Sequence, residues 1–449
     1  MKTRKQNERV VYYGGRNEDL YWGWVQFPAL YQMSDGNIGI YVHDDDDSWM
    51  SLGDNTGKYL VTENEGESWR KATKEDVAKM GTILPSGDVL RVSVQPPVEL
   101  KGVEEAPWQF GNYRTPADPI IPQKSEDPKK LPMPITTYSD IFEQKFKVYY
   151  LDTLPDGMVE KRFSFYRLKA GETEGRKEFA PVDWKYRTVV SFPPHHATRE
   201  GEFDKTSIMI KQAGLYGCRR PIVAPDGSLY VAHYCGNAVD PFTGVYHGCT
   251  STYIFRSTDE GRSWKVIGYI PYQPDESKDI LAHLKAGFDE PSLAFLPNGE
   301  ILCLMRTCDV FCGAPEWGPT YLARSSDGGR TWSKPEYFKD RGALPQLLQL
   351  ECGVTLAVIT RPGIYVYASY DGGKTWDDGL EIMTDKDRST LANEPPARAN
   401  FHQWAGSCCN CTILPLGKNK AILAFSDFYT PDENGVKRKA IKTIEIVVD

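Results

Sequence analysis

The most restrictive feature of this 449-residue sequence is an octet that recurs along the chain. Its pattern is Ser-x-Asp-x-Gly-x-Ser/Thr-Trp, and it occupies Ser257–Trp264, Ser325–Trp332 and Ser369–Trp376, with a weaker copy at Thr62–Trp69. Each copy ends in a tryptophan that can bury its ring against a sheet. A short Asp carboxylate accepts backbone N–H bonds within a turn, and Gly supplies the positive φ that a tight turn requires. The octet therefore predicts a recurring β-hairpin turn.

A second repeat is a hairpin in which two short apolar strands flank a turn, often Asp-Gly or Asn-Gly. It occurs six times: Pro28–Tyr41, Thr82–Val92, Pro221–Val231, Pro291–Leu302, Pro345–Leu356 and Cys411–Leu423. Together with the octet it gives units of four strands, with the octet between the third and fourth strands. Radial repetition of such units forms a propeller. The predicted fold class is therefore all-β, a six-bladed β-propeller.

The two ends of the chain are expected to share one sheet. Arg9–Tyr13 and Thr443–Val448 are both strand-like, and their pairing would remove an exposed sheet edge. We expect residues 1–449 to form a single domain. Residues 95–212 are too long for one hairpin, so they should hold the rest of blade two plus an insertion.

Composition excludes several classes of function. A formal net charge of −8 gives no attraction to nucleic acid or to an anionic membrane. There is no run of about eighteen apolar residues that could span a bilayer. The charged N-terminus is not followed by an apolar stretch, so a cytoplasmic location is expected, with a processed secreted form as the alternative. The single CxxC spacing of Cys408 and Cys411 is a weak zinc signal, and we expect no metal or organic cofactor.

The octets resemble the Asp boxes of sialidases. Hairpins and boxes together extend this resemblance over nearly the whole chain, apart from the insertion. Asp boxes mark a fold that hosts several activities, so the boxes alone do not show catalysis. The resemblance implies a propeller of the glycoside hydrolase type whose partner is a carbohydrate.

Chain direction predicts where the site lies. The first strand of each unit would start at one face of the propeller, and the second strand would end at the same face. Residues at the start of each first strand and at the end of each second strand would then converge on this face from every blade. They are Gln26, His43, Asp44, Arg219, Arg220, His233, Glu290, Arg306, Gln346, Arg361, His402 and Asp427. Several arginines at one opening favour an anionic ligand, and the guanidinium fork matches a carboxylate. The predicted partner is therefore an acidic glycan.

The resemblance also assigns roles within this set. Asp289–Leu293, followed by Arg306, resembles the sialidase segment that carries a buried Glu and the second arginine of a substrate-binding triad. Arg361 resembles the third arginine. Two positions depart from the family pattern: Gln26 stands near the place of the first arginine, and Cys408 aligns with the nucleophilic tyrosine. The acid/base Asp falls in the loop that contains Asp44 and Asp45.

The predicted function is an exo-acting glycoside hydrolase of sialidase type that removes a terminal acidic sugar, either sialic acid or a uronic acid. Glu290 would activate a nucleophile or stabilise an oxocarbenium-like transition state, and Asp44 or Asp45 would protonate the leaving oxygen. The substrate-binding candidates are Gln26, His43, Arg219, Arg306, Gln346, Arg361 and His402. One alternative is a glycan-binding propeller without catalysis. The other is a polysaccharide lyase in which His233 removes the proton beside a uronate carboxylate.

Overall fold

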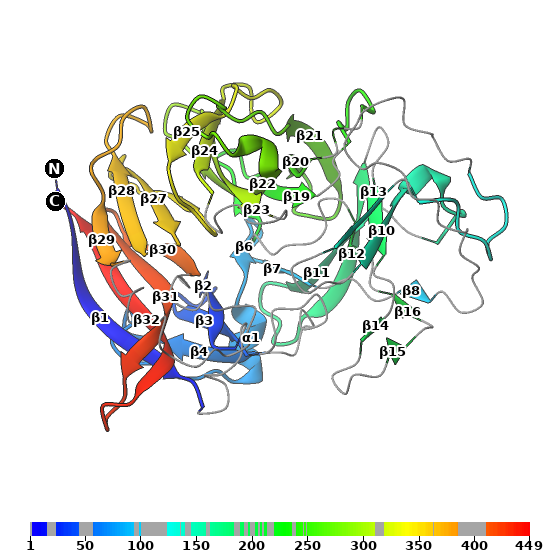
Figure 1. The fold of residues 1–449 in the computed structure, drawn as a ribbon. Coiled ribbons are helices and arrows are strands. Elements are labelled where there is room, and N and C mark those ends of the chain that lie inside the picture. Colours follow the sequence, from blue (N-terminus) through cyan, green and yellow to red (C-terminus); the bar gives the residue numbers. More distant parts are fainter. Residues whose placement is uncertain are drawn as a thin grey trace.

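The computed structural model is mostly β and contains several four-stranded antiparallel sheets (Figure 1). It describes residues 2–15, 24–44, 57–93, 98–99, 124–134, 136–139, 145–158, 162–183, 189–192, 196–197, 203–204, 207–208, 211–212, 220–235, 239–245, 247, 249–309, 318–361, 363–384 and 410–449. Helices in this part of the chain are α1 (Lys74–Lys79) and two 3-10 turns, η2 (Leu151–Thr153) and η3 (Ala282–Leu284). None of these described helices is long and apolar enough to cross a membrane.

Three of the predicted hairpins begin sheets whose four strands are adjacent in both sequence and space. Sheet 1 contains β2 (Gln26–Gln32), β3 (Ile38–His43), β4 (Lys58–Thr62) and β5 (Arg70–Lys71). Sheet 4 contains β22 (Lys285–Phe295), β23 (Ile301–Asp309), β24 (Thr320–Ser325) and β25 (Glu336–Lys339). Sheet 5 contains β26 (Gln346–Gln349), β27 (Thr355–Thr360), β28 (Ile364–Ser369) and β29 (Leu380–Met383). In all three, the hairpin forms the first two strands, as the sequence predicts.

Two further four-stranded units join edge to edge. Sheet 2 contains β6 (Thr82–Ile83), β7 (Val89–Val92), β11 (Arg162–Leu168) and β12 (Arg176–Asp183). Sheet 3 contains β18 (Ile222–Val223), β19 (Leu229–Cys235), β20 (Ser251–Ser257) and β21 (Trp264–Ile270). A short parallel pairing of β12 with β21, in which Val182 lies opposite Trp264, links them into one eight-stranded sheet.

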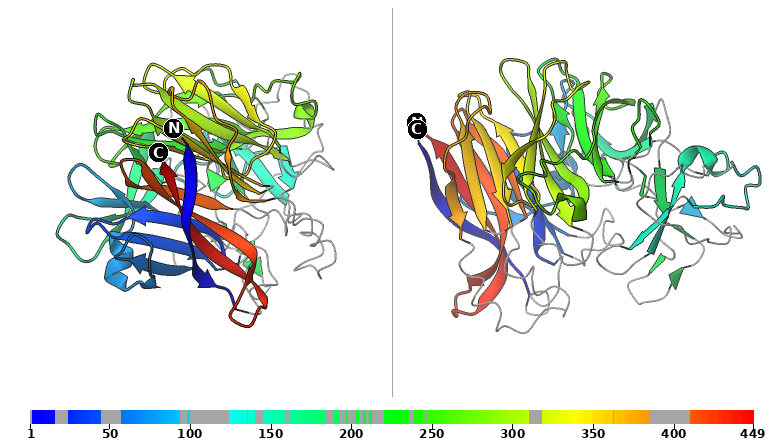
Figure 2. Two further views of the ribbon diagram at one scale, coloured as in Figure 1. Left: turned by 90° about the vertical axis from the view of Figure 1, so that its left-hand side faces the viewer. Right: turned by 45° about the horizontal axis from the view of Figure 1, so that its top comes forward.

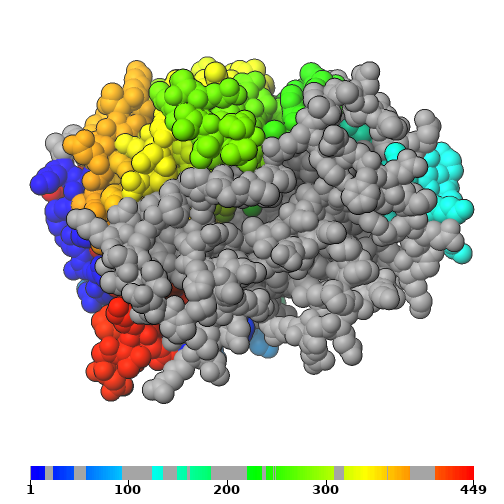
Figure 3. Space-filling view, viewed as in Figure 1, coloured from blue at the N-terminus to red at the C-terminus, as the bar shows by residue number. Residues whose placement is uncertain are grey.

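The two ends of the chain meet in sheet 6. It contains β30 (Cys411–Gly417), β31 (Lys420–Pro431), β32 (Lys437–Val448) and β1 (Thr3–Tyr13), and β1 is its edge strand. Thr3 lies opposite Val448 and Tyr13 opposite Ala440, which confirms the predicted pairing of the two ends. The termini therefore lie side by side (Figures 1 and 2). The far ends of β31 and β32 project from the molecule at the lower left of Figure 3.

Each octet lies between the third and fourth strands of its sheet, as predicted, and all four copies share one hydrogen-bond pattern. The hydroxyl of the first residue donates to Oδ1 of the third residue at 2.7–2.8 Å, and it accepts the N–H of the fifth residue, a Gly, at 2.7–2.9 Å. Oδ1 also accepts the N–H of the seventh residue at 2.9–3.0 Å. In the weaker copy, Asn64 makes these contacts in place of Asp. The side chain at the third position thus closes the turn.

The same turns also receive contacts from neighbouring sheets. In three cases a side chain donates to a carbonyl of the next sheet's octet: Arg167 Nη2 to Glu260 O (2.7 Å), Tyr230 Oη to Gly328 O (3.1 Å) and Arg324 Nη1 to Gly372 O (2.9 Å). In a fourth case, Lys420 of sheet 6 forms an ion pair with Glu65 in the octet of sheet 1, at 2.7 Å. These contacts all run in the same direction around the molecule, from one sheet to the following one.

Apolar clusters fill the spaces between neighbouring sheets. Separate clusters join sheets 2 and 3, 3 and 4, 4 and 5, and 5 and 6. Another cluster joins sheet 6 back to sheet 1, through residues such as Ile422 and Ile40. Sheets 1 and 2 meet at Met80, which packs with Met33 and Val61, and at Arg91, whose guanidinium lies between the rings of Tyr59 and Tyr166. The order of contacts among the described sheets is therefore cyclic.

Residues between β7 and β18 contribute further strands outside these six units. One sheet contains β9 (Thr136–Ser139), β10 (Lys145–Tyr150), β13 (Val189–Phe192) and β17 (Lys211–Gln212). Two small pairs are β14 (His196–Ala197) with β15 (Phe203–Asp204), and β8 (Val98–Glu99) with β16 (Ser207–Ile208). Figures 1 and 2 place these elements on one side of the molecule, next to sheet 2.

The octet that contains Asp327 predicts that the free energy of unfolding depends on pH in the acid range. Partial burial opposes ionisation of Asp327, but hydrogen bonds from Thr331, Ser325 and Arg330 outweigh it and lower the pKa of this carboxyl to about 2. A lowered pKa in the folded state stabilises the fold above the unfolded-state pKa, near 4, and this stabilisation is lost as the pH falls toward 2. Asp327→Ala should therefore lower the free energy of unfolding by about 1 kcal/mol at pH 7, because charged hydrogen bonds are weakened by solvent exposure. Urea unfolding at pH 7 and pH 2.5 measures the difference, which should shrink at the lower pH.

Asn64→Ala is the matched control, because Asn64 occupies the equivalent place in the weaker octet and has no titrating group. Its cost should be the same at both pH values. A pH-independent cost for Asp327→Ala would contradict the assignment of an ionised carboxylate to this turn.

Candidate functional site

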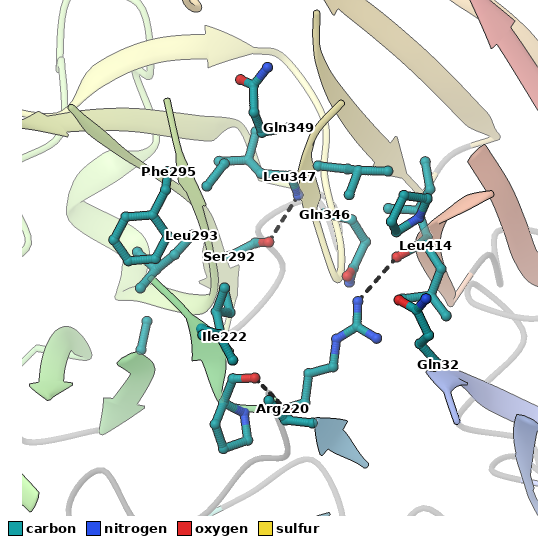
Figure 4. A pocket seen from close by; sticks show the side chains of 18 of the residues that line it. Gln32, Arg220, Ile222, Ser292, Leu293, Phe295, Gln346, Leu347, Gln349 and Leu414 are labelled. Carbon is teal, nitrogen blue, oxygen red and sulfur yellow. Dashed lines mark hydrogen bonds between the residues drawn. The ribbon is translucent and has the colours of Figure 1, made fainter. Parts of the chain in front are cut away.

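The first strands of all six sheets surround one central cavity of about 500 Å³ (Figure 4). Its described lining comes from β2, β6, β18, β22, β26 and β30, the residues next to them, and Ala232 of β19. Residues at or near the starts of three hairpin repeats, Pro221, Pro291 and Gln346, line the cavity, and we call the region around the hairpin starts its mouth. This is the region where the sequence predicts the site.

The mouth contains backbone in an unusual conformation. Three residues that directly precede the proline with which a hairpin repeat begins have positive φ: Phe27 (46°), Glu290 (47°) and Leu344 (42°). We call these the strand-start kinks. In sheets 1 and 4 the strand register also shifts at this point. Positive φ in such residues costs about 1–3 kcal/mol each, and such strain is concentrated at functional sites in proteins.

Glu290 and Arg306 are in direct contact. Nε of Arg306 lies 2.9 Å from Oε2 of Glu290 and donates to Oδ1 of Asp289 at 2.8 Å. The side chain of Asp289 is 4% exposed, whereas those of Glu290 and Arg306 are 17% and 15% exposed. Arg306 is therefore held by two carboxylates, and only the deeper one, Asp289, is removed from solvent.

The peptide units of Leu344 connect three sheets at the mouth. Its N–H donates to Oε2 of Glu290 at 2.6 Å. Its carbonyl accepts from Nε2 of Gln346 at 3.1 Å and lies 3.9 Å from the Sγ donor of Cys411. Sheets 4, 5 and 6 thus meet at one strand-start kink, and Glu290 is fixed there by a main-chain donor as well as by Arg306.

Arg361 lies next to this group on sheet 5. It directly follows β27, has a φ of 49° and is 7% exposed. The preceding Thr360 donates its hydroxyl to the carbonyl of Ala343, the residue before Leu344. The structure therefore brings Glu290 and Arg306 into contact and places Arg361 on the neighbouring segment.

Sheet 1 contributes a second group. Gln26 and His43 lie opposite each other in the β2–β3 pairing and are both buried. His43 Nδ1 lies 3.0 Å from the hydroxyl of Tyr41, and its imidazole packs against Phe27. Asp44, directly after β3, forms an ion pair with Lys58 at 2.5 Å. These contacts lie within sheet 1, and Lys58 also donates to the hydroxyl of Tyr12 on β1, in sheet 6.

Electrostatics keep Lys58 protonated. Burial acts to lower the pKa of this ammonium, but hydrogen bonds with Asp44 and Tyr12 outweigh burial and raise the pKa above its usual range. Asp44 therefore has an ammonium group as its neighbour.

His233 lies between sheets 2 and 3. It is 2% exposed, and its ring centroid lies 5.7 Å from that of Phe163 and 6.0 Å from that of Phe255. Three other candidate residues, Arg219, Asp45 and His402, lie outside the described residues, as does Cys408. The sequence predicts Asp427 at the end of a strand, but it lies within β31, where it forms an ion pair with Lys442 at 2.8 Å.

Among the described residues, no group of three or more His, Cys, Asp or Glu side chains is arranged to hold a metal ion. The described part of the mouth contains two carboxylates, Asp289 and Glu290, that contact the guanidinium of Arg306.

Sequence reasoning assigned no role to three residues of this region. Leu344, Asp289 and Lys58 each contact a candidate residue, but no local sequence pattern indicates that they do so. One signal was present: a proline stands at the start of the first strand in four of the six hairpins, namely Pro28, Pro221, Pro291 and Pro345. A proline repeated at one position indicates a fixed backbone geometry there.

Comparison with known proteins shows similarity in fold only. No protein-family model matches the sequence, and no curated protein matches it. A solved structure of a protein of unknown function from Dyadobacter fermentans DSM 18053 aligns over 100% of this chain and 99% of its own, with 15% identity and a TM-score of 0.52. The two chains therefore share a fold, and this similarity assigns no activity.

Structures of glycosidases are similar at a lower level. NanB sialidase from Streptococcus pneumoniae covers 98% of this chain with 70% of its own, at 12% identity and a TM-score of 0.43. An α-L-arabinanase from Penicillium chrysogenum, solved with arabinobiose, covers 98% of both chains at 10% identity and a TM-score of 0.45. Similarity this remote carries no conclusion about the chemistry of this chain.

A double-mutant cycle tests the central contact of the mouth. Residues in one ion-paired network are coupled by about 0.5–3 kcal/mol. We expect Glu290→Ala and Arg306→Ala to show a coupling energy of about 1–3 kcal/mol in urea unfolding, because the pair is mostly shielded from water. The Arg4–Asp449 pair, whose side chains are 48% and 55% exposed, is the control and should couple by less than about 1 kcal/mol. Additive effects at Glu290 and Arg306 would show that their contact contributes nothing.

Proposed function

We propose that the six sheets close into a six-bladed β-propeller and that the protein is a glycoside hydrolase acting on a terminal acidic sugar. The cyclic packing of the sheets and the shared sheet of the two chain ends support the architecture. The proposal treats residues 1–449 as one domain, in which residues 95–212 complete blade two and add an insertion.

The observation that carries the function is the Glu290–Arg306 contact at the mouth, beside the strained Leu344 peptide. A guanidinium group recognises a carboxylate through paired, charge-assisted hydrogen bonds, and a carboxylate can stabilise positive charge that develops on a sugar ring. The two groups are fixed in relation to each other by main-chain and side-chain contacts. Such preorganisation is what electrostatic stabilisation of a transition state requires.

The proposal assigns roles to the remaining residues. Arg306 and Arg361, with Arg219, hold the substrate carboxylate, and Glu290 activates the nucleophile or stabilises the oxocarbenium-like transition state. Asp44 or Asp45 protonates the leaving oxygen. The other mouth residues that the proposal assigns to substrate binding are Gln26, His43, Gln346 and His402. The substrate is a glycan with a terminal sialic or uronic acid.

Arg306→Ala should lower kcat/KM on an acidic aryl glycoside by at least about 100-fold, because it removes a charge-assisted contact that acts in the transition state. The measurement is initial-rate kinetics on a panel of aryl sialosides and aryl uronides. Arg262→Ala is the control, because Arg262 is exposed in an octet turn away from the mouth. Unchanged activity in Arg306→Ala would remove Arg306 from the site.

The acid role can be separated from the binding role by the leaving group. Loss of a general acid typically costs about 10²–10⁴-fold when the leaving group is poor, and much less when it leaves as a stable phenolate. Either Asp44→Asn or Asp45→Asn should therefore abolish cleavage of a natural glycan and largely preserve cleavage of a nitrophenyl glycoside. Equal losses on both substrates, in both variants, would assign the acid to another residue.

A glycan-binding role without catalysis is the second candidate. The observation that favours it is that Arg306 is already held by Asp289 and Glu290, as expected for a rigid recognition surface. Product analysis distinguishes the candidates: a hydrolase releases a saturated sugar, whereas a binding protein leaves the glycan intact. An unsaturated product that absorbs in the ultraviolet would instead identify a lyase.

A further inference from the structure

The first strands of the six sheets direct main-chain groups toward the central cavity. Each first strand is the terminal strand of its sheet, so one of its edges pairs with the second strand and the other edge pairs with no strand. The described lining of the cavity comes mainly from these first strands. In an antiparallel ladder, the main-chain groups of successive residues point alternately to one edge and to the other. Every second residue of a first strand therefore directs its N–H and C=O away from the sheet.

The hairpin turns determine which residues these are. In five of the hairpins, the last residue before the turn donates its N–H across the turn at 2.8–2.9 Å, and these donors are Met33, Leu84, Ala224, Leu296 and Leu350. The residue before each donor belongs to a pair that exchanges no hydrogen bond, so its main-chain groups point to the unpaired edge. These residues are Gln32, Ile83, Val223, Phe295 and Gln349, and all five line the cavity. We call them the inner-edge ring.

Hydroxyl groups already bind the main chain at these edges. Leu347, two residues before Gln349, donates its N–H to the hydroxyl of Ser292 at 2.9 Å (Figure 4). Pro221, two residues before Val223, accepts the hydroxyl of Thr82 at 2.6 Å through its carbonyl. A hydroxyl is both a donor and an acceptor, and these two contacts use it in each role.

The inner-edge ring is accessible to solvent. Gln32 is exposed, and the other four residues of the ring are half-buried. Within the described part of the chain, no protein group forms a hydrogen bond with the cavity-facing main chain of Ile83, Val223 or Phe295. Water must therefore satisfy these donors and acceptors in the free protein. A ligand whose groups both donate and accept can replace that water.

We propose that the inner-edge ring binds a neutral polyhydroxylated ligand of about the size of one sugar unit. Its hydroxyls accept from the N–H groups of the ring and donate to the carbonyls, as Ser292 and Thr82 do at neighbouring positions. Such a mixed edge does not suit an inorganic anion, which only accepts, or a metal cation, which needs acceptors alone.

The size and the walls of the cavity fit the same ligand. Apolar side chains such as Leu293 and Leu347 line it together with the main-chain groups, and a sugar likewise combines apolar C–H groups with hydroxyls. Ligand pockets in proteins measure about 300–1,000 Å³, and this cavity measures about 500 Å³.

The inner-edge ring is separate from the Glu290–Arg306 contact and does not rest on the proposed function. Its residues lie next to the hairpin turns, whereas Glu290 lies at a hairpin start. The ring requires binding only, and a protein that cleaves no glycan can still have it.

Calorimetric titration of the full chain with D-glucose, D-galactose, D-xylose and myo-inositol, followed by residue-resolved hydrogen exchange, tests the proposal. At least one of these polyols should bind and should slow exchange of the Ile83, Val223 and Phe295 amides by about 2–10-fold, the effect of one hydrogen bond each. The Leu84, Ala224 and Leu296 amides are internal references, because they are already bonded across the turns, and should change by less than about twofold. Binding of none of the four, or protection confined to the segments around Glu290 and Arg306, would overturn the proposal.

Val223→Pro tests one main-chain contact directly. It removes a cavity-facing N–H and no ladder bond, because Val223 and Leu229 form a non-bonded pair, and proline is tolerated at such edge positions. Binding of the polyol that titrates wild type should weaken by about 2–10-fold. Val223→Ala, the matched control, shortens the side chain but keeps the N–H, and its affinity should lie within about twofold of wild type.

Equal affinities of the two Val223 variants would contradict the proposal. If Val223→Pro does not fold, the hydrogen exchange of wild type decides the question by itself. Hydrolysis of aryl glycosides is independent of both measurements, so a failure of the inner-edge ring is distinguishable from a failure of the proposed function.

Discussion

The hydrogen bonds between β1 and β32 are the constraint on which the rest of the structure depends. They join residues from the two ends of the chain in one sheet, and Thr3 lies opposite Val448. Without β1, the outer side of β32 would be an exposed strand edge, which invites pairing with another chain. With β1 in place, sheet 6 packs against both sheet 5 and sheet 1. Each of the six sheets therefore has a neighbouring sheet on both sides. The convergence of six first strands on one cavity follows from this closed order.

Backbone strain is found at the strand-start kinks, Phe27, Glu290 and Leu344, each of which directly precedes a proline. At Phe27 and Glu290 the strand register also shifts. Their positive φ values are stabilised by what surrounds them: Leu344 by its contacts with Glu290, Gln346 and Cys411, and Phe27 by packing against His43. The same contacts orient the charged groups at the mouth. The residues with a strained backbone and the candidate functional side chains therefore belong to one group of contacting residues.

Much of the fold could be predicted because its signals are local. An octet determines its own turn through hydrogen bonds within eight residues, and a hairpin is encoded by two apolar runs and the turn between them. The contact between Glu290 and Arg306 is also local, because the two residues lie on paired strands of one hairpin.

The remaining features depend on distant parts of the chain. Leu344 approaches Glu290 across two sheets, and Arg220 reaches carbonyls that lie 190 and 193 residues away in sequence. Lys58 contacts Asp44 only because β4 returns beside β3. No pattern within a short window encodes such contacts. His233 illustrates the same limit, because its position at the end of β19 was predictable but its enclosure by Phe163 and Phe255 comes from the packing of two sheets.

The central claim is that guanidinium groups at the mouth of a closed ring of sheets bind the carboxylate of an acidic sugar. The most direct measurement is a crystal structure of the protein with a non-hydrolysable glycoside of sialic or glucuronic acid. The account predicts that a carboxylate oxygen of the terminal sugar lies about 3 Å from a guanidinium nitrogen of Arg306, with the ring beside Glu290. A sugar bound on the outer faces of the sheets, or with its carboxylate directed away from Arg306, would contradict it.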